Sequence, residues 1–149
     1  MYAPHTVTLY NTYMEVDKNN FEERAVHYIT ILEGVLVQES KGANVRASGL
    51  VGADAVKLYI PFSVKAYDGI TGKEKKFVGP TDFIKAENKS ELWTLGLGPS
   101  NFFVKGILIE PDKPSSVIEN TNDDVFNITK VDRKDYGSKS MQHWEVGGA

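Results

Sequence analysis

The chain has 149 residues, the length of one domain with room for a long insertion. Its 17 Lys and Arg residues against 20 Asp and Glu leave a formal net charge of −3, which argues against a protein whose main task is gripping phosphates. Hydrophobic residues make up 41% of the chain and charged residues 25%, as in globular domains. Cysteine is absent, which excludes disulfide scaffolds, thiolate zinc sites and cysteine nucleophiles.

No targeting or membrane-spanning segment is expected. Met1–Tyr13 has no basic stretch followed by an apolar core, so it does not resemble a signal peptide. The apolar stretches Leu58–Phe62 and Phe102–Ile109 are far shorter than the roughly 20 residues that cross a bilayer. We therefore expect a protein that folds in a bacterial-type cytosol and does not associate with membranes.

Alternating apolar residues predict strands from the beginning of the chain. The first strand is expected at Val7–Tyr13, and the second at Ala25–Gln38, where Gly34 indicates a bulge or a bend. The third, Val56–Phe62, alternates most regularly and should bury one face. Pro61 cannot donate to a ladder of hydrogen bonds, so it is expected at a sheet edge or near the strand end.

Two more strands are expected at Phe102–Ile109, with a bend at Gly106, and at Val125–Asp132. Short helices are expected at Pro80–Glu87 and Pro114–Glu119, because each begins with a proline and residues typical of helix starts. The whole pattern predicts a single, mainly β domain: a small antiparallel β-barrel or sandwich with one or two short helices and two long loops.

The two long loops exceed the roughly 12–15 residues usual for a connection within a compact domain. Lys41–Asp54 consists mostly of small residues and includes three glycines. The sequence leaves open whether this loop contacts another subunit. Val64–Ser90 is charged and contains several glycines, and we interpret it as a solvated hairpin or insertion.

Residue patterns for catalysis or metal binding are weak. His5, His27 and His143 lie far apart in the sequence without metal-ligand spacing, so a structural role is favoured for each. No serine lies in a nucleophile elbow, and Asp123-Asp124 lacks the spacing of a calcium loop. We expect no enzyme activity, no cofactor and no metal site.

The last stretch, residues 135–149, carries Met141 and Trp144 after a turn at Gly137. Two interpretations stay open. Trp144 packs back on its own domain as a lid, or the stretch is a tail that docks on a neighbouring subunit, since aromatic residues and Met are enriched at interface cores. The candidate contact residues are Tyr136, Met141, His143, Trp144, Glu145 and Val146.

Several short motifs occur in order along essentially the whole chain. They are Val7–Asn11, Ser40–Val45, Leu58–Phe62, Trp93–Leu95, Val104–Gly106, and the end of the chain at 135–138 and 143–148, which is the most specific. Together they resemble a family of small proteins from the head–tail morphogenesis region of tailed phages and prophages of Gram-positive bacteria. These are often labelled minor capsid proteins and are similar to head-completion (stopper) proteins. Where related chains have a Pro-Gly-Asp turn, this sequence has Gly98–Asn101.

The resemblance implies a structural protein of the virion neck, at the head–tail interface, made in the bacterial host cytoplasm. Copies of the chain would form a ring, six- or twelve-fold, between the portal or adaptor protein and the tail proteins. Such a ring retains packaged DNA and provides the tail docking surface. It lets double-stranded DNA pass without sequence-specific binding, which suits a mildly acidic protein.

In stopper proteins, a loop between the second and third strands closes the channel. The resemblance places that loop at 41–54, where small side chains would let several copies approach closely on an axis. The candidate gate residues are Lys41, Gly42, Ala43, Asn44, Val45, Arg46, Ala47, Ser48 and Gly49.

Other classes of protein stay open. The first alternative is another structural virion protein, such as a capsid decoration, a head fibre or a tail-terminator ring. A cellular ligand-binding β-barrel, for a nucleic acid or a sugar, would show an apolar or basic groove. An enzyme would need His27 or His143 clustered with carboxylates at the surface.

Overall fold

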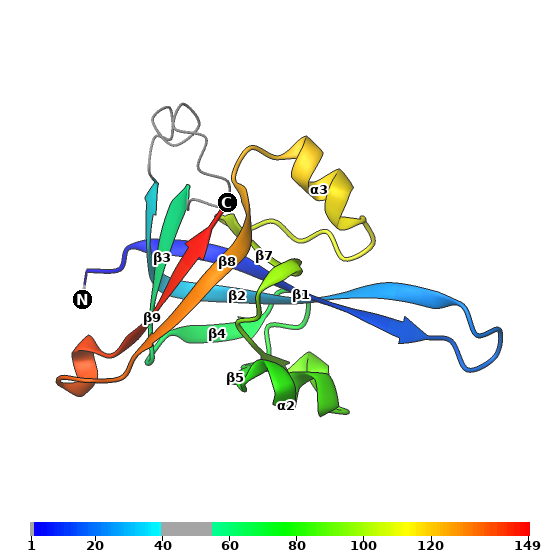
Figure 1. Cartoon of the computed structure of the whole chain (residues 1–149), viewed down its shortest axis with the longest axis horizontal. Helices are drawn as coiled ribbons and strands as arrows, with labels where there is room; N and C mark the ends of the chain where they lie inside the picture. The colour runs from blue at the N-terminus through cyan, green and yellow to red at the C-terminus, as the bar shows by residue number, and fades with distance from the viewer. Residues whose placement is uncertain (1, 40–54) are drawn as a thin grey trace.

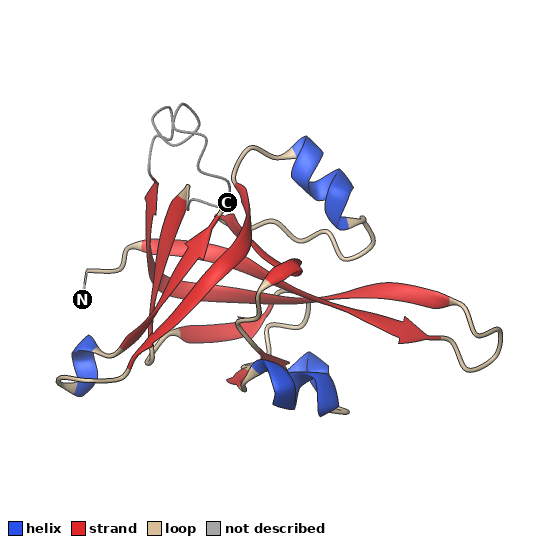
Figure 2. Ribbon diagram, viewed as in Figure 1, coloured by secondary structure: helices blue, strands red, loops and turns tan. Residues whose placement is uncertain are grey.

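The computed structural model describes residues 2–39 and 55–149, and strands dominate it (Figure 2). The strands are β1 His5–Val16, β2 Glu23–Glu39, β3 Val56–Pro61, β4 Lys65–Asp68, β5 Lys76–Phe77, β6 Leu92–Trp93, β7 Gly98–Lys105, β8 Val125–Lys134 and β9 His143–Gly148. The helices are α2 Pro80–Lys85 and α3 Ser115–Thr121, with short 3₁₀ turns η1 Lys89–Glu91 and η2 Lys139–Met141. The predicted mainly β class with short helices is confirmed.

Six strands form a closed ring of antiparallel pairings (Figure 1). The pairing runs β1-β7-β8-β9-β3-β2 and returns from β2 to β1. β3 and β4 lie one after the other along β2, because β3 pairs with Leu36–Glu39 and β4 with Thr30–Glu33. Closure in this way pairs most strand edges within the subunit, so few are left open to other chains.

The main hydrophobic core fills the inside of the ring. Successive strand residues point to opposite faces, so Val7 and Leu9 lie in this core while Tyr10 packs in a second cluster outside it. Other strands contribute in the same way. Fully buried members of the core include Leu32, Leu58, Ile60, Phe103, Ile128 and Val146.

Gly34 is the extra residue of a bulge in β2. The register of the β1–β2 pair shifts between His5, which faces Val35, and Thr6, which faces Glu33. Gly34 adopts a φ of +86°, a left-handed conformation that glycine tolerates without a Cβ clash. The predicted bulge or bend is confirmed.

The strand predicted at Phe102–Ile109 is correct only in its first half. β7 ends at Lys105, and Gly106, with a φ of +87°, turns the chain away from the sheet. Beyond this turn Ile107 is 62% exposed. The apolar residues 107–109 therefore continue the sequence pattern beyond β7 but do not continue its strand pairing.

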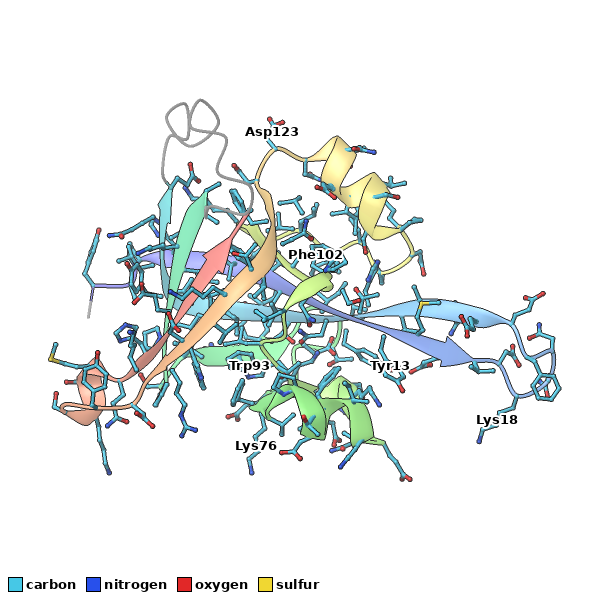
Figure 3. All side chains as sticks on the ribbon, in the orientation of Figure 1. Tyr13, Lys18, Lys76, Trp93, Phe102 and Asp123 are labelled. Atoms are coloured by element: carbon cyan, nitrogen blue, oxygen red, sulfur yellow. The ribbon has the colours of Figure 1, made fainter. Side chains whose placement is uncertain are left out.

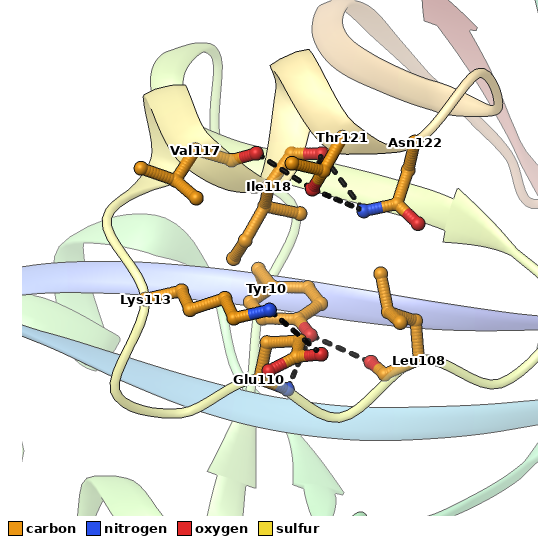
Figure 4. Close-up of polar contacts among 8 residues, drawn as sticks. All are labelled: Tyr10, Leu108, Glu110, Lys113, Val117, Ile118, Thr121 and Asn122. Atoms are coloured by element: carbon orange, nitrogen blue, oxygen red, sulfur yellow. Dashed lines mark hydrogen bonds and ion pairs between the residues drawn. The ribbon is translucent and has the colours of Figure 1, made fainter.

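Two hydroxyl groups on β1, those of Thr8 and Tyr10, hold the segment that follows β7, and Figure 4 shows the contacts of Tyr10. Thr8 Oγ1 donates to Gly106 O at 2.8 Å and accepts from Leu108 N at 3.0 Å. Tyr10 OH donates to Leu108 O at 2.6 Å and accepts from Glu110 N at 3.0 Å. These bonds satisfy backbone groups that would otherwise have needed a partner strand.

Helix α3 covers the outer face of β1 and β7. Its Ile118 is fully buried against Tyr10, Ile29, Phe102 and Val104. The Tyr10 and Phe102 rings stack with centroids 4.6 Å apart. The helix predicted at Pro114–Glu119 is thus confirmed, and its role is to close the second cluster.

The prediction of a solvated hairpin or insertion at 64–90 is correct in part: most of its residues are exposed, but the segment also packs on the ring of strands. β4 pairs with β2, and Ala66, Lys75 and Phe83 from this segment are buried. β5 pairs with β6 and brings Phe77 and Trp93 against the ring core. Because charged residues are frequent in this segment, the sequence did not predict that a few of its apolar residues pack on the ring. The helix predicted at the end of this segment is confirmed as α2.

The end of the chain is a central strand of the ring. β9 lies between β3 and β8, and Trp144 and Val146 are buried in the main core. Docking of these two side chains on a neighbouring subunit is therefore wrong, and the interpretation that Trp144 packs on its own domain is confirmed. Position 148 in β9 requires glycine, because a Cβ atom there would lie only 2.8 Å from Val56 Cγ1.

Candidate functional site

β1 and β2 continue past the ring as a two-stranded ribbon, residues 12–28 (Figure 1). β7 pairs with β1 only as far as Asn11, and β4 pairs with β2 only as far as Thr30. Within the described residues, the two strands of the ribbon pair only with each other. An isolated two-stranded hairpin has marginal stability in water, so contacts at the base of the ribbon are needed to stabilise its projecting conformation.

His27 anchors the base of the ribbon. Its Nε2 donates to Lys113 O at 2.7 Å, and its Nδ1 lies 2.7 Å from Thr12 Oγ1. The imidazole of His27 also makes T-shaped contacts with the aromatic rings of Tyr10 and Phe102, whose centroids lie 5.5 and 6.0 Å from its own. Both ring nitrogens are therefore used, and the position of His27 is that of a structural residue.

Tyr28 and Tyr13 fix the other face of the base. Tyr28 OH donates to Glu15, and its ring meets the Phe83 ring of α2 edge-on at 5.9 Å. Burial, followed by the bond to Glu15, raises the pKa of Tyr28 above its ordinary value. Lys89 Nζ lies 4.4 Å from the centroid of Tyr13. The base of the ribbon is thus packed on both sides.

The outer end of the ribbon presents apolar side chains to solvent. Phe21 is 80% exposed, Val16 55% and Met14 52%. Phe21 adopts a φ of +58°, which is rare for an aromatic residue. Two bonds of 2.9 Å close the turn, Phe21 N to Asp17 O and Asp17 N to Glu22 O. The turn thus holds an aromatic side chain out in water.

Carboxylates outnumber cations on this outer end. Figure 3 shows Lys18 at the far end of the ribbon and Tyr13 nearer its base. The charged residues from 15 to 24 are Glu15, Asp17, Lys18, Glu22, Glu23 and Arg24. The outer end therefore combines an apolar centre with an acidic surround. We call residues 16–22 the tip.

A groove of about 460 Å³ lies between the ribbon base, α2 and the start of β7. Its apolar lining comes from Tyr13 and Met14 on the ribbon and from Pro80, Phe83 and Ile84 on α2. In the part of the chain that the structure describes, no charged side chain lines this groove.

A larger pocket of about 920 Å³ lies beside β4 and β5. Four aromatic rings form its inner wall. Trp144 lies 4.4 Å from both Phe62 and Phe77 and 5.6 Å from Trp93, measured between ring centroids. Charged and polar residues surround these rings. They include Glu33, Lys65, Tyr67, Glu74, Lys76 and Glu91.

Lys75 is a buried cation in the wall of this pocket. Its Nζ donates to Ile29 O at 3.1 Å and lies 3.8 Å from Asp68 Oδ2. Burial lowers the pKa of Lys75 to about 8, although Asp68 acts in the opposite direction. The lysine thus ties the β4–β5 turn to the edge of β2.

The candidate gate residues, Lys41 through Gly49, lie outside the described residues, so the gate stays a prediction. Among the C-terminal candidates, Tyr136 is 70% exposed and Met141 65%. His143 and Glu145 are partly exposed, and Glu145 lies 3.4 Å from Lys57 Nζ. The connection from β8 through η2, which contains Tyr136 and Met141, lies at the opposite end of the molecule from the ribbon (Figure 1).

The tip and the groove were not found from the sequence. The polar run Asp17–Glu22 between two strands predicts a hairpin turn, and the isolated Phe21 within it was the available signal. Groove and pocket join residues distant in the chain, such as Met14 with Ile84, so no local pattern marks them.

Metal-ligating side chains do not gather in the described residues: no three His, Asp or Glu lie close enough together to hold an ion. His5 Nδ1 accepts from Val37 N, and His143 Nδ1 donates to Met141 O. No helix within residues 2–39 and 55–149 has the length and apolar character needed to cross a membrane.

The fold and these features define a mainly β domain with a closed ring, one projecting ribbon and an aromatic-walled pocket. The chain belongs to a family of unknown function (DUF6751), which matches residues 2–149. Neither the curated proteins nor the solved structures contain a match to the chain.

Proposed function

We propose that this protein is a structural subunit of the virion neck of a tailed phage, forming a head-completion ring between portal or adaptor and tail. The observation that carries the proposal is the projecting ribbon with its exposed apolar tip. The ring of strands already encloses a core, so Phe21 and Val16 contribute little to it. Exposed apolar side chains on a projecting element are typical of assembly surfaces.

The architecture also suits subunits that join side by side. A ring needs a contact in which one surface of each copy meets a different surface of the next. The ribbon extends from one end of the molecule, while η2 and the exposed Tyr136 and Met141 lie at the other (Figure 1). The second set of residues is available for contacts with portal, adaptor or tail.

Charge supports the same role. The formal net charge is −3, and the tip is acidic, so DNA moving past the subunit would meet few lasting phosphate contacts. The sequence motifs that resemble stopper proteins add to this argument, since most of those in the described residues fall on the ring strands β1, β3, β7 and β9, and one falls on β6.

Electron microscopy of a lysate from a phage lacking this gene tests the proposal. We expect loose tails beside tailless heads that have lost their DNA, because an open head neither retains DNA nor binds a tail. Restoring the gene on a plasmid is the control. Normal, tailed and infectious particles would overturn the neck role and favour a decoration or head-fibre protein.

A ligand-binding role is a second candidate, favoured by the pocket beside β4 and β5. Aromatic rings with a surround of both charges suit a neutral sugar better than a phosphate backbone. Trp93 and Trp144 are the two tryptophans of the chain, and both line the pocket. Intrinsic fluorescence therefore reports on it directly. An unchanged spectrum on titration with neutral oligosaccharides would remove this candidate.

A further inference from the structure

The tip and the groove both expose apolar side chains to solvent. The tip projects Phe21 and Val16, and the groove offers an apolar space of about 460 Å³ beside Ile84. We propose that the tip of one copy, led by Phe21, inserts into the groove of a second copy of this chain. The inference rests on the proposed function, for which it supplies the contact between neighbouring subunits.

The tip has the properties of an anchor. A left-handed φ in a largely exposed aromatic residue is costly and is maintained where it places a side chain for use. The backbone N–H and C=O of Asp17 hydrogen-bond to Glu22 O and Phe21 N, and these two bonds hold Phe21 in this position in the single subunit. Pre-organised aromatic anchors are the residues that carry binding energy in interfaces.

The groove has unsatisfied apolar surface of its own. Ile84 is 57% exposed and Met14 52%, and both line it. Leu97, 63% exposed, lies between Gly96 and Gly98 at the start of β7. Burying a phenyl ring here would remove apolar area of both copies from water.

One cation at the edge of an otherwise uncharged groove favours the acidic tip of another copy as the occupant. The tip and its flanks carry four carboxylates, Glu15, Asp17, Glu22 and Glu23, against two cations. The groove is lined by no charged side chain among the described residues, and the Lys89 ammonium lies at its edge, 4.4 Å from the Tyr13 ring. An acidic tip therefore meets a cation and no lining carboxylate when it enters.

The contact is between molecules. The groove lies at the base of the ribbon, where residues 12–14 line it. Phe21 lies in the turn that joins the two strands, three residues after Lys18, which marks the far end of the ribbon (Figure 3). The ribbon would have to fold back on itself to fill its own groove. Tip and groove are different surfaces, so each copy can give one contact and receive another, and such head-to-tail contacts close into a ring when the rotation allows.

The absence of cysteine makes a crosslinking test direct. Full-length Lys18→Cys and Ile84→Cys variants, which both keep Phe21, are mixed, one of them carrying a size tag, and treated with a short bis-maleimide. We expect a tip-to-groove heterodimer, and a ladder of multimers from the variant carrying both cysteines. Lys18→Cys mixed with Ile107→Cys is the matched control, because Ile107 is 62% exposed but lies in the segment leading to α3.

Three results would overturn the contact. These are heterodimer yields no higher than with the Ile107→Cys control, tip-to-tip homodimers in place of heterodimers, and multimers of the Lys18→Cys/Ile84→Cys variant that are unaffected by adding Phe21→Asn. Failure of the contact is distinguishable from failure of the neck role. Crosslinks together with normal particles from the gene deletion would leave the contact and remove the neck role, and missing crosslinks with a head-completion defect would do the reverse.

Discussion

The ring and the ribbon are built from the same two strands and differ in what covers them. In the ring half of β1, Val7 and Leu9 are buried in a core and both edges of the strand are paired. In the ribbon half, Met14 and Val16 belong to the same strand but are half exposed, with one edge paired. The same alternation of apolar residues therefore gives buried core residues in the ring half of β1 and solvent-exposed apolar residues in the ribbon half.

The largest effect is expected when the ring core is broken. Trp144→Ala should lower the free energy of unfolding by about 3–5 kcal/mol, because the side chain is 8% exposed and packs on Phe62, Phe77 and Trp93. Denaturant unfolding measures this loss. Tyr136→Ala, at a 70% exposed site, is the control and should change stability by less than about 0.5 kcal/mol. An equal effect of both variants would contradict the assignment of Trp144 to the core.

A close approach in the ring gives the next effect. Gly148→Ala should cost about 1–3 kcal/mol, because the added Cβ would lie 2.8 Å from Val56 Cγ1 and 3.0 Å from Phe126 Cβ. Gly79→Ala is the matched control, since a Cβ there meets nothing within 4 Å. Thermal unfolding of the pair distinguishes steric crowding from a general effect of replacing glycine.

Lys75 connects the ring to its insertion and makes stability depend on pH. Its pKa is lowered to about 8 in the folded protein from 10.5, so between these values the unfolded chain binds more protons. Stability should therefore rise with pH from 8 toward 10, by up to about 1.4 kcal/mol per pH unit. Lys75→Met should flatten this slope. Raised tyrosine pKa values, as at Tyr28, act in the opposite direction only above pH 10. A slope that persists in Lys75→Met would contradict the assignment.

The smallest effect on stability is expected at the tip. Phe21→Asn should leave the free energy of unfolding unchanged or raise it by up to about 1 kcal/mol, because asparagine tolerates a φ of +58° better than phenylalanine. The same variant should lose its part in tip-to-groove assembly, measured by sedimentation. Lys18→Asn, in the same turn, is the control and should assemble normally. A folding defect in Phe21→Asn would show that the ring depends on the tip.

Much of the fold could be predicted because strand periodicity and turn residues act locally. The alternation in Val56–Pro61 and the positions of Gly34 and Pro80 were sufficient for a strand, a bulge and a helix start. The pattern failed where an element is too short to show a period. β5 and β6 have two residues each, and their burial depends on partners distant in the chain.

The candidate site divides in the same way. Tyr136 and Met141 are exposed, as an interface would require, whereas Trp144 and Val146 are core residues. The sequence left both interpretations of Trp144 open, because an aromatic residue near a chain end has the same local pattern in a core and in an interface. The tip was visible in the sequence only as a polar turn containing one phenylalanine. Its exposure and its left-handed φ needed the folded hairpin.

The amino-acid sequence by itself was sufficient to predict the mainly β class and most strands and to exclude thiol chemistry, since each of these depends on residue type and short-range spacing. Ring closure was not accessible in this way. It depends on the pairing of β1 with β7 and of β3 with β9, which join residues 82 to 98 positions apart in the sequence. Those long-range pairings cover one half of β1 and leave the other half free, and that difference produced the tip and the groove.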